Sequence, residues 1–566
     1  MRMPRHRSQV LCFALGFFGL LLAFCLFSSA GLADSPKTSA SASRDYTPIA
    51  SQLDQIIDKA LADAKVTASA RSDDAEFIRR LSLDLRGRVP TAEQVVRFIA
   101  DKDVNKRQKL VEDFLDDPEY GEHMGIIWYH RLVKKTMDNA LIISYKFQDW
   151  LEKEFNKNTT WDELVRKILM AEGERDDNPA TVFYLAHSEG NKQPEVQPAR
   201  VVATTSQMFM GIKLECCECH NHPFDDGLKQ KDFWGVAAFF NGLHATHTAK
   251  RDEAVPGIVE RFAQGRPRRK VQDGQREPAP FGEIVIPDTN GKTEKARYLL
   301  GDTPSLSKSK SPRLAFLDWL TSKENPYFSR SMANKMWANF FGRGIIEPLD
   351  DMRDLSTATH PEVLELLSKE FAASGYDVKH LIRCIVNSQT YQRTSKPLPG
   401  NKSDKVLYSH APIKVMTADM LFDSLQVVLN HTPTEDDRPG KRAKIAQQQR
   451  KRRGTPREQF RNFFHAEADD DAGVTEEYGH GIPQVLRLMN DDKMNDIGDI
   501  VKEMMSQSKT PEQMIQALYL RILSRYATSK EVERMKKYLK QDVIPARAYR
   551  DMFWALVNSS EFVFNH

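Results

Sequence analysis

A five-residue segment in the first half of the chain carries the side chains best suited to bind a redox group. It reads Cys216-Cys217-Glu218-Cys219-His220 and satisfies the pattern C-x-x-C-H. The thiols of Cys216 and Cys219 are spaced to form thioether bonds with the two vinyl groups on one edge of a porphyrin, and the histidine directly after them reaches the iron from one face. The spacing therefore predicts one covalently attached haem c per chain, with His220 as the proximal ligand.

The same residue types also suit two other kinds of site. Mixtures of cysteine and histidine bind zinc or non-haem iron. Cys216, Cys219 and His220, with His222 two residues further on, therefore form an alternative metal site. A redox-active disulfide or a purely structural cluster is the third interpretation.

A haem iron in this segment needs a distal ligand or an open position. No methionine occurs between His220 and Met332, so the downstream distal methionine of many soluble cytochromes c has no counterpart there. His222 is too close in sequence to His220 to reach the opposite face of the porphyrin. Bis-histidine or open-site iron is therefore favoured over His/Met ligation, which implies a lower reduction potential. The distal candidates are His187, Met208, Met210, His244 and His247.

The N-terminal residues predict export. Arg2, Arg5 and Arg7 precede the uncharged apolar run Val10–Phe27 and a stretch of small residues, which is the order of a signal peptide over residues 1–33. An uncleaved anchor is the alternative, since 18 apolar residues can just span a bilayer. A Ser/Ala-rich tether follows over 34–45. We expect a location in the periplasm or cell envelope, with no membrane span after signal removal.

Charge and cysteine content exclude two classes of protein. The formal net charge of +3 equals the three arginines of the leader, so the chain after residue 33 is neutral. A neutral chain argues against nucleic acid as a partner, because phosphate binding needs a basic footprint. Outside the leader the only cysteines are the three of the cluster and Cys384, so the fold is not stapled by disulfides. Cys384 is the only plausible disulfide partner of Cys217, a thiol that would be reactive beside a haem edge.

Hydrophobic periodicity predicts a mainly α fold of two helical domains with a small β-hairpin region between them. We expect a cytochrome-c-like helical domain over 46–245, a β-containing linker over 246–310 and a second helical domain over 311–566. A charged insert at about 433–478 interrupts the second domain. Its basic part, Lys441–Arg453, is followed by an acidic part, which indicates a solvated segment; an anion-binding site is the alternative.

Several local signals place elements around the motif. Residues 199–211 predict a helix that ends at Gly211 and leads directly into the cysteines, and a further helix follows with Phe233 and Phe240 on one face. Thr91 with Gln94 resembles a capping box, as does Thr160 with a glutamate three residues on. The only clear β signal is a hairpin, from Glu283–Pro287 to Ala296–Leu300, with its turn near Asn290.

No motif identifies catalytic residues. G-x-S-x-G, H-E-x-x-H, a P-loop and the Rossmann fingerprint are all absent. In the second half, Arg330, Asn334, Arg343 and His360 lie among closely spaced polar residues and could line a pocket. Arg343 stands between two glycines on a predicted turn, from which a side chain can project toward a ligand. Structural ion pairs and helix caps are the other explanation of these residues.

Further motifs lie along both halves of the chain. The first half contains Phe77–Pro90 (FIRRLSLDLRGRVP), Asp117–Tyr120 (DPEY), Glu215–Phe224 (ECCECHNHPF) and Asp232–Phe240 (DFWGVAAFF). The second half contains Ala315–Trp319 (AFLDW), Asn334–Gly344 (NKMWANFFGRG), Ile482–Asn490 (IPQVLRLMN) and Trp554–His566 (WALVNSSEFVFNH). In this order they resemble a planctomycete family of exported proteins in which a cytochrome-c-like domain of the PSCyt type precedes a planctomycete-specific domain of the PSD type. The chain departs from the family at Cys217, where a small residue is usual, and in its basic insert.

The resemblance implies a function without specifying a reaction. Both domains are of unknown function, and the first is named for its C-x-x-C-H. The expected function is that of a haem-binding electron-transfer component of the cell envelope. A partner is implied as well: an exported protein resembling sulfatases or phosphatases, in the use of polysaccharides. The alternative is a non-redox envelope scaffold or glycan-binding protein with a structural metal.

Overall fold

The computed structural model describes residues 44–133, 145–189, 195–223, 225–250, 253–262, 280–287, 289–299, 301–429, 456–465, 497–541 and 544–566. Residues Tyr46–His566 form one compact unit. The predicted signal peptide and nearly all of the tether lie outside the described residues, as does most of the charged insert. Within the described ranges, no helix combines the length and apolar character needed to cross a bilayer.

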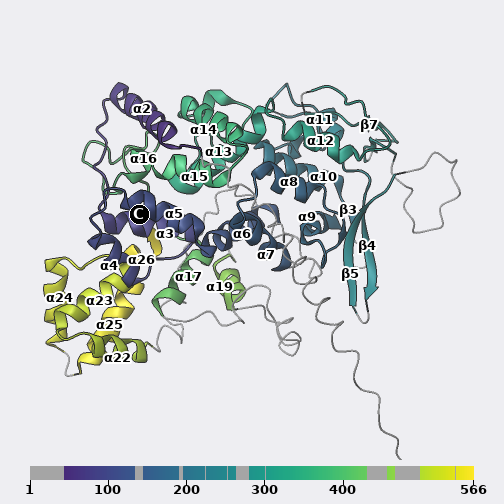
Figure 1. The fold of residues 1–566 in the computed structure, drawn as a ribbon. Coiled ribbons are helices and arrows are strands. Elements are labelled where there is room, and N and C mark those ends of the chain that lie inside the picture. Colours follow the sequence, from purple (N-terminus) through teal and green to yellow (C-terminus); the bar gives the residue numbers. More distant parts are fainter. Residues whose placement is uncertain are drawn as a thin grey trace, which may run out of the picture. The chain divides into compact units, whose positions relative to one another are not determined.

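The compact unit is mainly helical, as the periodicity predicts (Figure 1). The first half contains α2 (Thr47–Asp63), α3 (Asp74–Arg86), α4 (Ala92–Ala100), α5 (Lys106–Asp116), α6 (Pro118–Leu132), α7 (Tyr145–Asn156), α8 (Trp161–Leu169), α9 (Val182–Ala186), α10 (Pro198–Thr205) and α11 (Gln230–Ala237). The second half contains α12 (Pro312–Leu320), α13 (Pro326–Phe341), α14 (Pro361–Ala373), α15 (Val378–Val386), α16 (Gln389–Gln392), α17 (Ala418–Val428), α19 (Pro456–His465), α22 (Gly498–Gln507), α23 (Pro511–Leu523), α24 (Ser529–Leu539), α25 (Pro545–Val557) and α26 (Ser560–Val563).

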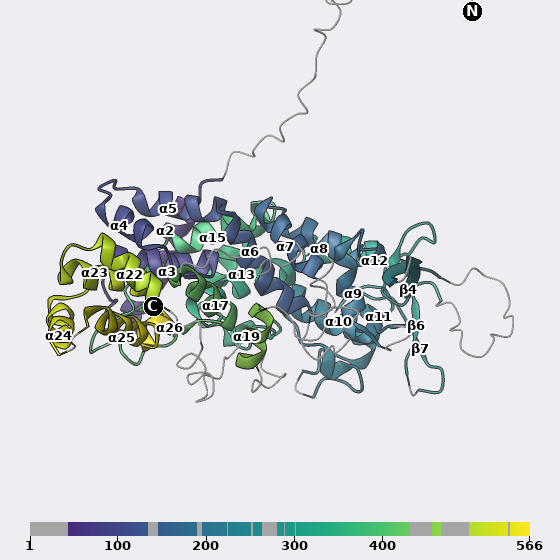
Figure 2. The ribbon, with the colours of Figure 1, turned by 90° about the horizontal axis from the view of Figure 1, so that it is seen from below.

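Residues from both predicted domains build the same cores. The larger hydrophobic core runs from Leu53 in α2 to Phe371 in α14 and Leu381 in α15. A second core joins the C-terminal helices, and Leu83 and Val89 of the first half contribute to it. Figures 1 and 2 show α22–α26 gathered beside α3 and α4. The two predicted segments therefore pack into one unit, and their boundaries remain predictions.

Helix α3 connects the halves because its polar side chains point into the protein. Every residue from Glu76 to Arg86 is buried. Arg79 donates to the carbonyl oxygen of Phe562 at 2.8 Å, and Asp84 accepts from Tyr391, Lys414 and Asn565 at 2.6–2.8 Å. Buried polar groups require such partners. The segment FIRRLSLDLRGRVP therefore links the first half of the chain to the second through buried hydrogen bonds.

The small sheets confirm one hairpin and reveal another. Strands β6 (Glu283–Val285) and β7 (Thr293–Lys295) pair antiparallel, as predicted, with the second strand a few residues earlier than expected. A longer hairpin of β4 (Leu243–Lys250) and β5 (Glu253–Glu260) was not predicted. β5 contains Pro256 and Gly257, which argue against a strand. The lack of a side chain at Gly257 lets β1 (Gly173–Glu174) approach, because a Cβ there would lie 2.7 Å from the carbonyl oxygen of Gly173.

Candidate functional site

The chain enters the cysteine cluster through a tightly fixed turn. Helix α10 continues into a single π-helical turn, Ser206–Met210, which ends at Gly211 with φ of +66°. The predicted helix end is therefore confirmed. A Cβ at Gly211 would lie 2.6 Å from Cγ of Met352, so only glycine fits this position. The backbone N–H of Met352 donates to the carbonyl oxygen of Gly211 at 2.8 Å, which ties the second half of the chain to the start of the site.

The three cysteines of the cluster divide into two accessible thiols and one buried thiol. Cys216 and Cys219 are exposed, whereas Cys217 is fully buried in the larger core. Burial, reinforced by the neighbouring Cys216, raises the pKa of Cys217 to about 11, so this side chain is a protonated thiol at neutral pH. Cys384, named above as the only plausible disulfide partner of Cys217, forms no disulfide with it. Cys384 is buried beside His380, with its Sγ 3.7 Å from Nε2 of that histidine.

Helix α11 holds the backbone of the cluster from the other side. The indole N–H of Trp234 donates to the carbonyl oxygen of Glu218 at 2.9 Å. The side-chain amide of Gln230 donates to the carbonyl oxygens of Glu218 and Cys219 at 3.1 and 3.0 Å. Trp234 is itself almost fully buried. These bonds fix the segment between the two exposed thiols and orient it outward.

The two histidines of the cluster have opposite hydrogen-bond roles. Nδ1 of His220 lies 2.7 Å from the carbonyl oxygen of Asn221, so it carries the proton and Nε2 holds the lone pair on an exposed ring. Nδ1 of His222 lies 3.4 Å from Nη1 of Arg353, a group that can only donate. Partial burial and the charge of Arg353 lower the pKa of His222. His220 therefore has the tautomer that metal-binding imidazoles use when they bind through Nε2.

The distal candidates are distributed over the first half of the chain. His187 is fully buried, and its two ring nitrogens lie 2.6 Å from the carbonyl oxygen of Phe183 and 2.7 Å from the hydroxyl of Thr204. Met208 and Met210 are core residues of the π-helical turn. His244 and His247 lie on β4, and the side chain of His247 is outside the described residues. The described candidates thus lie in the core or on a strand, and a role as distal ligand stays a prediction for each of them.

The four polar residues of the second half each have a local contact. Arg330 pairs with Glu365 at 3.1 Å. Asn334 is fully buried and fastens the turn at residues 345–346 through its amide. Arg343 donates to the carbonyl oxygen of Lys405 at 3.4 Å. His360 is buried against the ring of Tyr408. These contacts are of the local kind that structural ion pairs and caps involve, and a pocket lined by the four residues stays a prediction.

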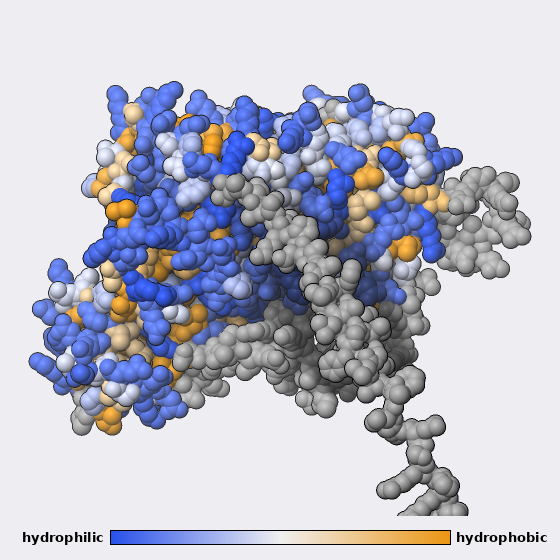
Figure 3. Space-filling model, viewed as in Figure 1, coloured by the Kyte–Doolittle hydropathy of each residue, from blue (hydrophilic) through white to orange (hydrophobic). Residues whose placement is uncertain are grey.

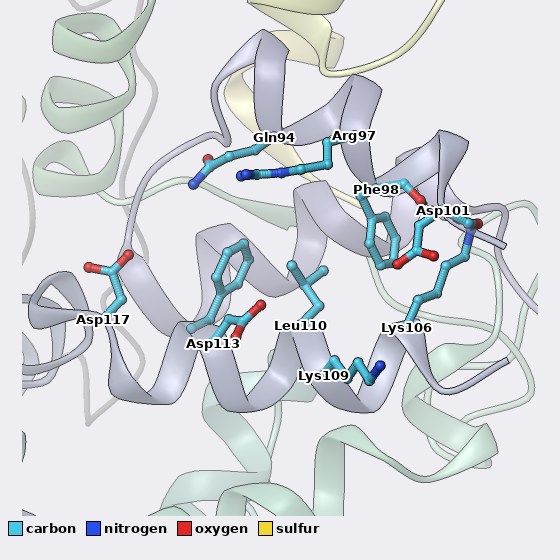
Figure 4. A pocket seen from close by; sticks show the side chains of 10 residues that line it. Gln94, Arg97, Phe98, Asp101, Lys106, Lys109, Leu110, Asp113 and Asp117 are labelled. Atoms are coloured by element: carbon cyan, nitrogen blue, oxygen red, sulfur yellow. Dashed lines mark hydrogen bonds between the residues drawn. The ribbon is translucent and has the colours of Figure 1, made fainter. Parts of the chain in front are cut away.

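Two further observations describe where ligands could bind. Among the described residues, no group of three or more His, Cys, Asp or Glu side chains converges to hold a metal ion. A pocket of about 450 Å³ lies between α4 and α5, with Arg97 on one wall and Asp113 and Asp117 on the other (Figure 4). Its aromatic floor, Phe98 and Phe114, is more than nine-tenths buried and presents little surface to a ligand.

Arg353, Trp234 and Gln230 support the cluster, and this role was not predicted from the sequence. Arg353 lies 131 positions from His222 and stands in no periodic pattern or motif, so no local signal connects it with the cysteines. The face drawn in Figure 3 is mostly hydrophilic with small scattered apolar patches.

Comparison with known proteins finds two family models that match successive segments of the chain. Residues 52–245 match the model of PSCyt2, a protein of unknown function (DUF1549), and residues 312–539 match that of PSD1, a protein of unknown function (DUF1553). No curated protein and no solved structure matches the chain. The chain therefore contains a segment that matches PSCyt2 followed by a segment that matches PSD1, two domains of unknown function in tandem order.

Proposed function

We propose that this protein is an exported, c-type-cytochrome-like electron-transfer protein that carries one covalent haem at Cys216 and Cys219, with His220 as the proximal ligand. The observation that carries the proposal is that the thiols of the cluster differ in exposure and that His220 has its lone pair on the exposed nitrogen. The two thiols with the required spacing are exposed, and the extra thiol of Cys217 is buried and protonated. The imidazole directly after them has its lone pair on the exposed Nε2.

The donor set fits haem better than the alternative metal site. Zinc or non-haem iron bound by protein alone takes three or four converging side chains, whereas a porphyrin supplies four nitrogens and needs only one imidazole from the motif. His222 is turned toward a cation, so its Nδ1 lone pair is already used. When bound, the haem would supply one-electron chemistry through its iron.

The surrounding residues would perform three tasks. Trp234 and Gln230 hold the backbone carbonyls of Glu218 and Cys219 and so keep the spacing of the thiols fixed. Burial of Cys217 prevents a third thioether or a wrong disulfide. The backbone carbonyl oxygen of Asn221 accepts a hydrogen bond from Nδ1–H of His220, which fixes the ring tautomer. The exported sulfatase-like or phosphatase-like partner remains a prediction.

The proposal is tested by single cysteine variants exported in a host with cytochrome c maturation. Cys217→Ala should retain the full haem signal on a denaturing gel, because its side chain lies away from the exposed edge of the loop. Cys216→Ala and Cys219→Ala should each lose most of it. Equal loss in all three variants would mean that the thiols are not sorted as proposed. Stoichiometric zinc without any haem would instead support the scaffold with a structural metal.

A further inference from the structure

Arg353 of the PSD1 domain reaches across to the cysteine loop of the PSCyt2 domain. Its Nη1 lies 3.1 Å from Oδ2 of Asp225 and 3.4 Å from Nδ1 of His222. Its Nε and Nη2 lie 2.9 and 2.7 Å from Oδ1 of Asp351. The side chain is only 19% exposed, so these contacts are partly shielded from water. One guanidinium therefore joins two carboxylates and one imidazole.

The guanidinium is held in a defined direction by the backbone around it. Asp351 forms an isolated antiparallel bridge with Ile212, which directly follows the fixed turn at Gly211. Asp225 is held in a turn of its own, since its Oδ1 accepts from the backbone N–H of Gly227 at 2.7 Å. Because both carboxylates that receive Arg353 are anchored, the group that faces His222 has little freedom to turn away.

The contact fixes which nitrogen of His222 holds the lone pair. A guanidinium has five donors and no acceptor, and it stays protonated in proteins. While it donates to Nδ1 of His222, that nitrogen must hold the lone pair and Nε2 must hold the proton. His220 has the reverse arrangement, with its lone pair on Nε2. The loop thus offers two imidazoles two residues apart, and only one of them has a free lone pair.

We propose that Arg353 is a positioning residue of the Cys216–His220 site, which holds His222 as a hydrogen-bond acceptor and so prevents it from replacing His220 as the iron ligand. This inference rests on the proposed function for its effect on haem, but the contact itself can be tested without haem. A residue of the PSD1 segment would thus help to determine which histidine of the PSCyt2 segment binds the iron. Neither family description states such a role.

The first measurement compares absorption and EPR spectra of haem-loaded protein. Wild type and His222→Ala should have the same spectrum. Arg353→Gln should show a second ligation species, because His222 is released to compete for iron, and the double variant R353Q/H222A should return to the wild-type spectrum. Arg353→Lys, which keeps a donor, should shift less than Arg353→Gln. Arg330→Gln is the matched control: it removes another ion-paired arginine of the same domain that does not touch the loop.

The second measurement needs no haem and remains decisive if Arg353→Gln loads haem poorly. Diethyl pyrocarbonate modifies imidazoles at an unprotonated nitrogen, and peptide mass spectrometry gives a rate for each histidine. In the wild-type protein without haem, His220 should react at least about fivefold faster than His222. In Arg353→Gln the rate of His222 should rise about threefold or more, with that of His220 unchanged.

The outcomes separate the two proposals. Absence of haem with the predicted modification rates would remove the proposed function and retain the Arg353 contact. Equal rates at the two histidines in the wild type would overturn the role of Arg353. A spectrum of R353Q/H222A that still matches R353Q would also overturn it, because Arg353 would then act through the loop as a whole and not through His222.

Discussion

Replacing Asp84 by asparagine should destabilise the whole compact unit, because this carboxylate joins three separate elements of the second half to α3. Its oxygens accept from Nζ of Lys414 at 2.6 Å, from Nδ2 of Asn565 at 2.7 Å and from the hydroxyl of Tyr391 at 2.8 Å. Asparagine keeps the size of the side chain but directs an NH₂ at donors and leaves Lys414 without its counter-ion. Removing one partner of a buried ion pair costs about 3–5 kcal/mol.

The size of the unit converts that cost into a melting temperature. Unfolding entropy of about 2.1 cal/mol/K per residue implies a loss of roughly 1 °C per kcal/mol for a unit of this length, so Tm should fall by about 3–5 °C. Scanning calorimetry should show one transition that shifts as a whole, since both halves share cores. Asp113→Asn, an exposed carboxylate change on α5, is the control and should shift Tm by less than about 0.5 °C.

A second substitution identifies the cause. Lys414→Met combined with Asp84→Asn removes both charges, so the double variant should recover about 2 kcal/mol relative to the sum of the single changes. Strict additivity would refute the ion-pair reasoning. Two separate calorimetric transitions, with only one of them sensitive to Asp84→Asn, would show that α3 does not join the two halves of the chain into one unit of unfolding.

Three further predictions follow from the site and its surroundings. Maleimide should label Cys216 and Cys219 of the native protein without haem and should spare Cys217 until denaturant is added; early labelling of all three would contradict the burial of Cys217. Gly211→Ala should cost about 1–3 kcal/mol in urea unfolding, because its φ is +66° and a Cβ would meet a side chain; an unchanged midpoint would argue against this geometry. Burial and a neighbouring glutamate raise the pKa of Asp149 to about 7, so its stabilising protonated form is lost as pH rises toward 7. Asp149→Asn should therefore gain about 1 kcal/mol over wild type at pH 8 after allowance for solvent screening, and nothing at pH 4; a gain independent of pH would exclude titration as the cause.

Local signals in the sequence predicted local structure well. Thr91 and Gln94 form the expected capping box. Thr160 stands at the start of α8 as expected, but its side chain makes no cap bond, so the box itself is absent. The β4–β5 hairpin was missed because Pro256 and Gly257 obscure its alternation, and its pairing with β1 depends on residues more than eighty positions away.

The candidate residues of the site could be chosen from the sequence, whereas the residues that support them could not. The spacing of Cys216, Cys219 and His220 marks them as candidates without any structure, and their role as ligands stays a prediction. The exclusion of Cys217 could not be predicted, because burial depends on how the loop packs against the larger core. The contact between Arg353 and His222 joins two domains distant in sequence, and only the fold brings these side chains together.

We propose that the exposed thiols of Cys216 and Cys219, together with His220, hold a covalent haem. The most direct measurement is a pyridine haemochrome spectrum, with intact-mass spectrometry, on protein exported in a host that matures c-type cytochromes. We expect about one covalent haem per chain in the wild type. In His220→Ala we expect the absorption spectrum of the native protein to change. A wild-type chain that carries no covalent haem under those conditions, or a full haem content and unchanged spectrum in His220→Ala, would contradict it.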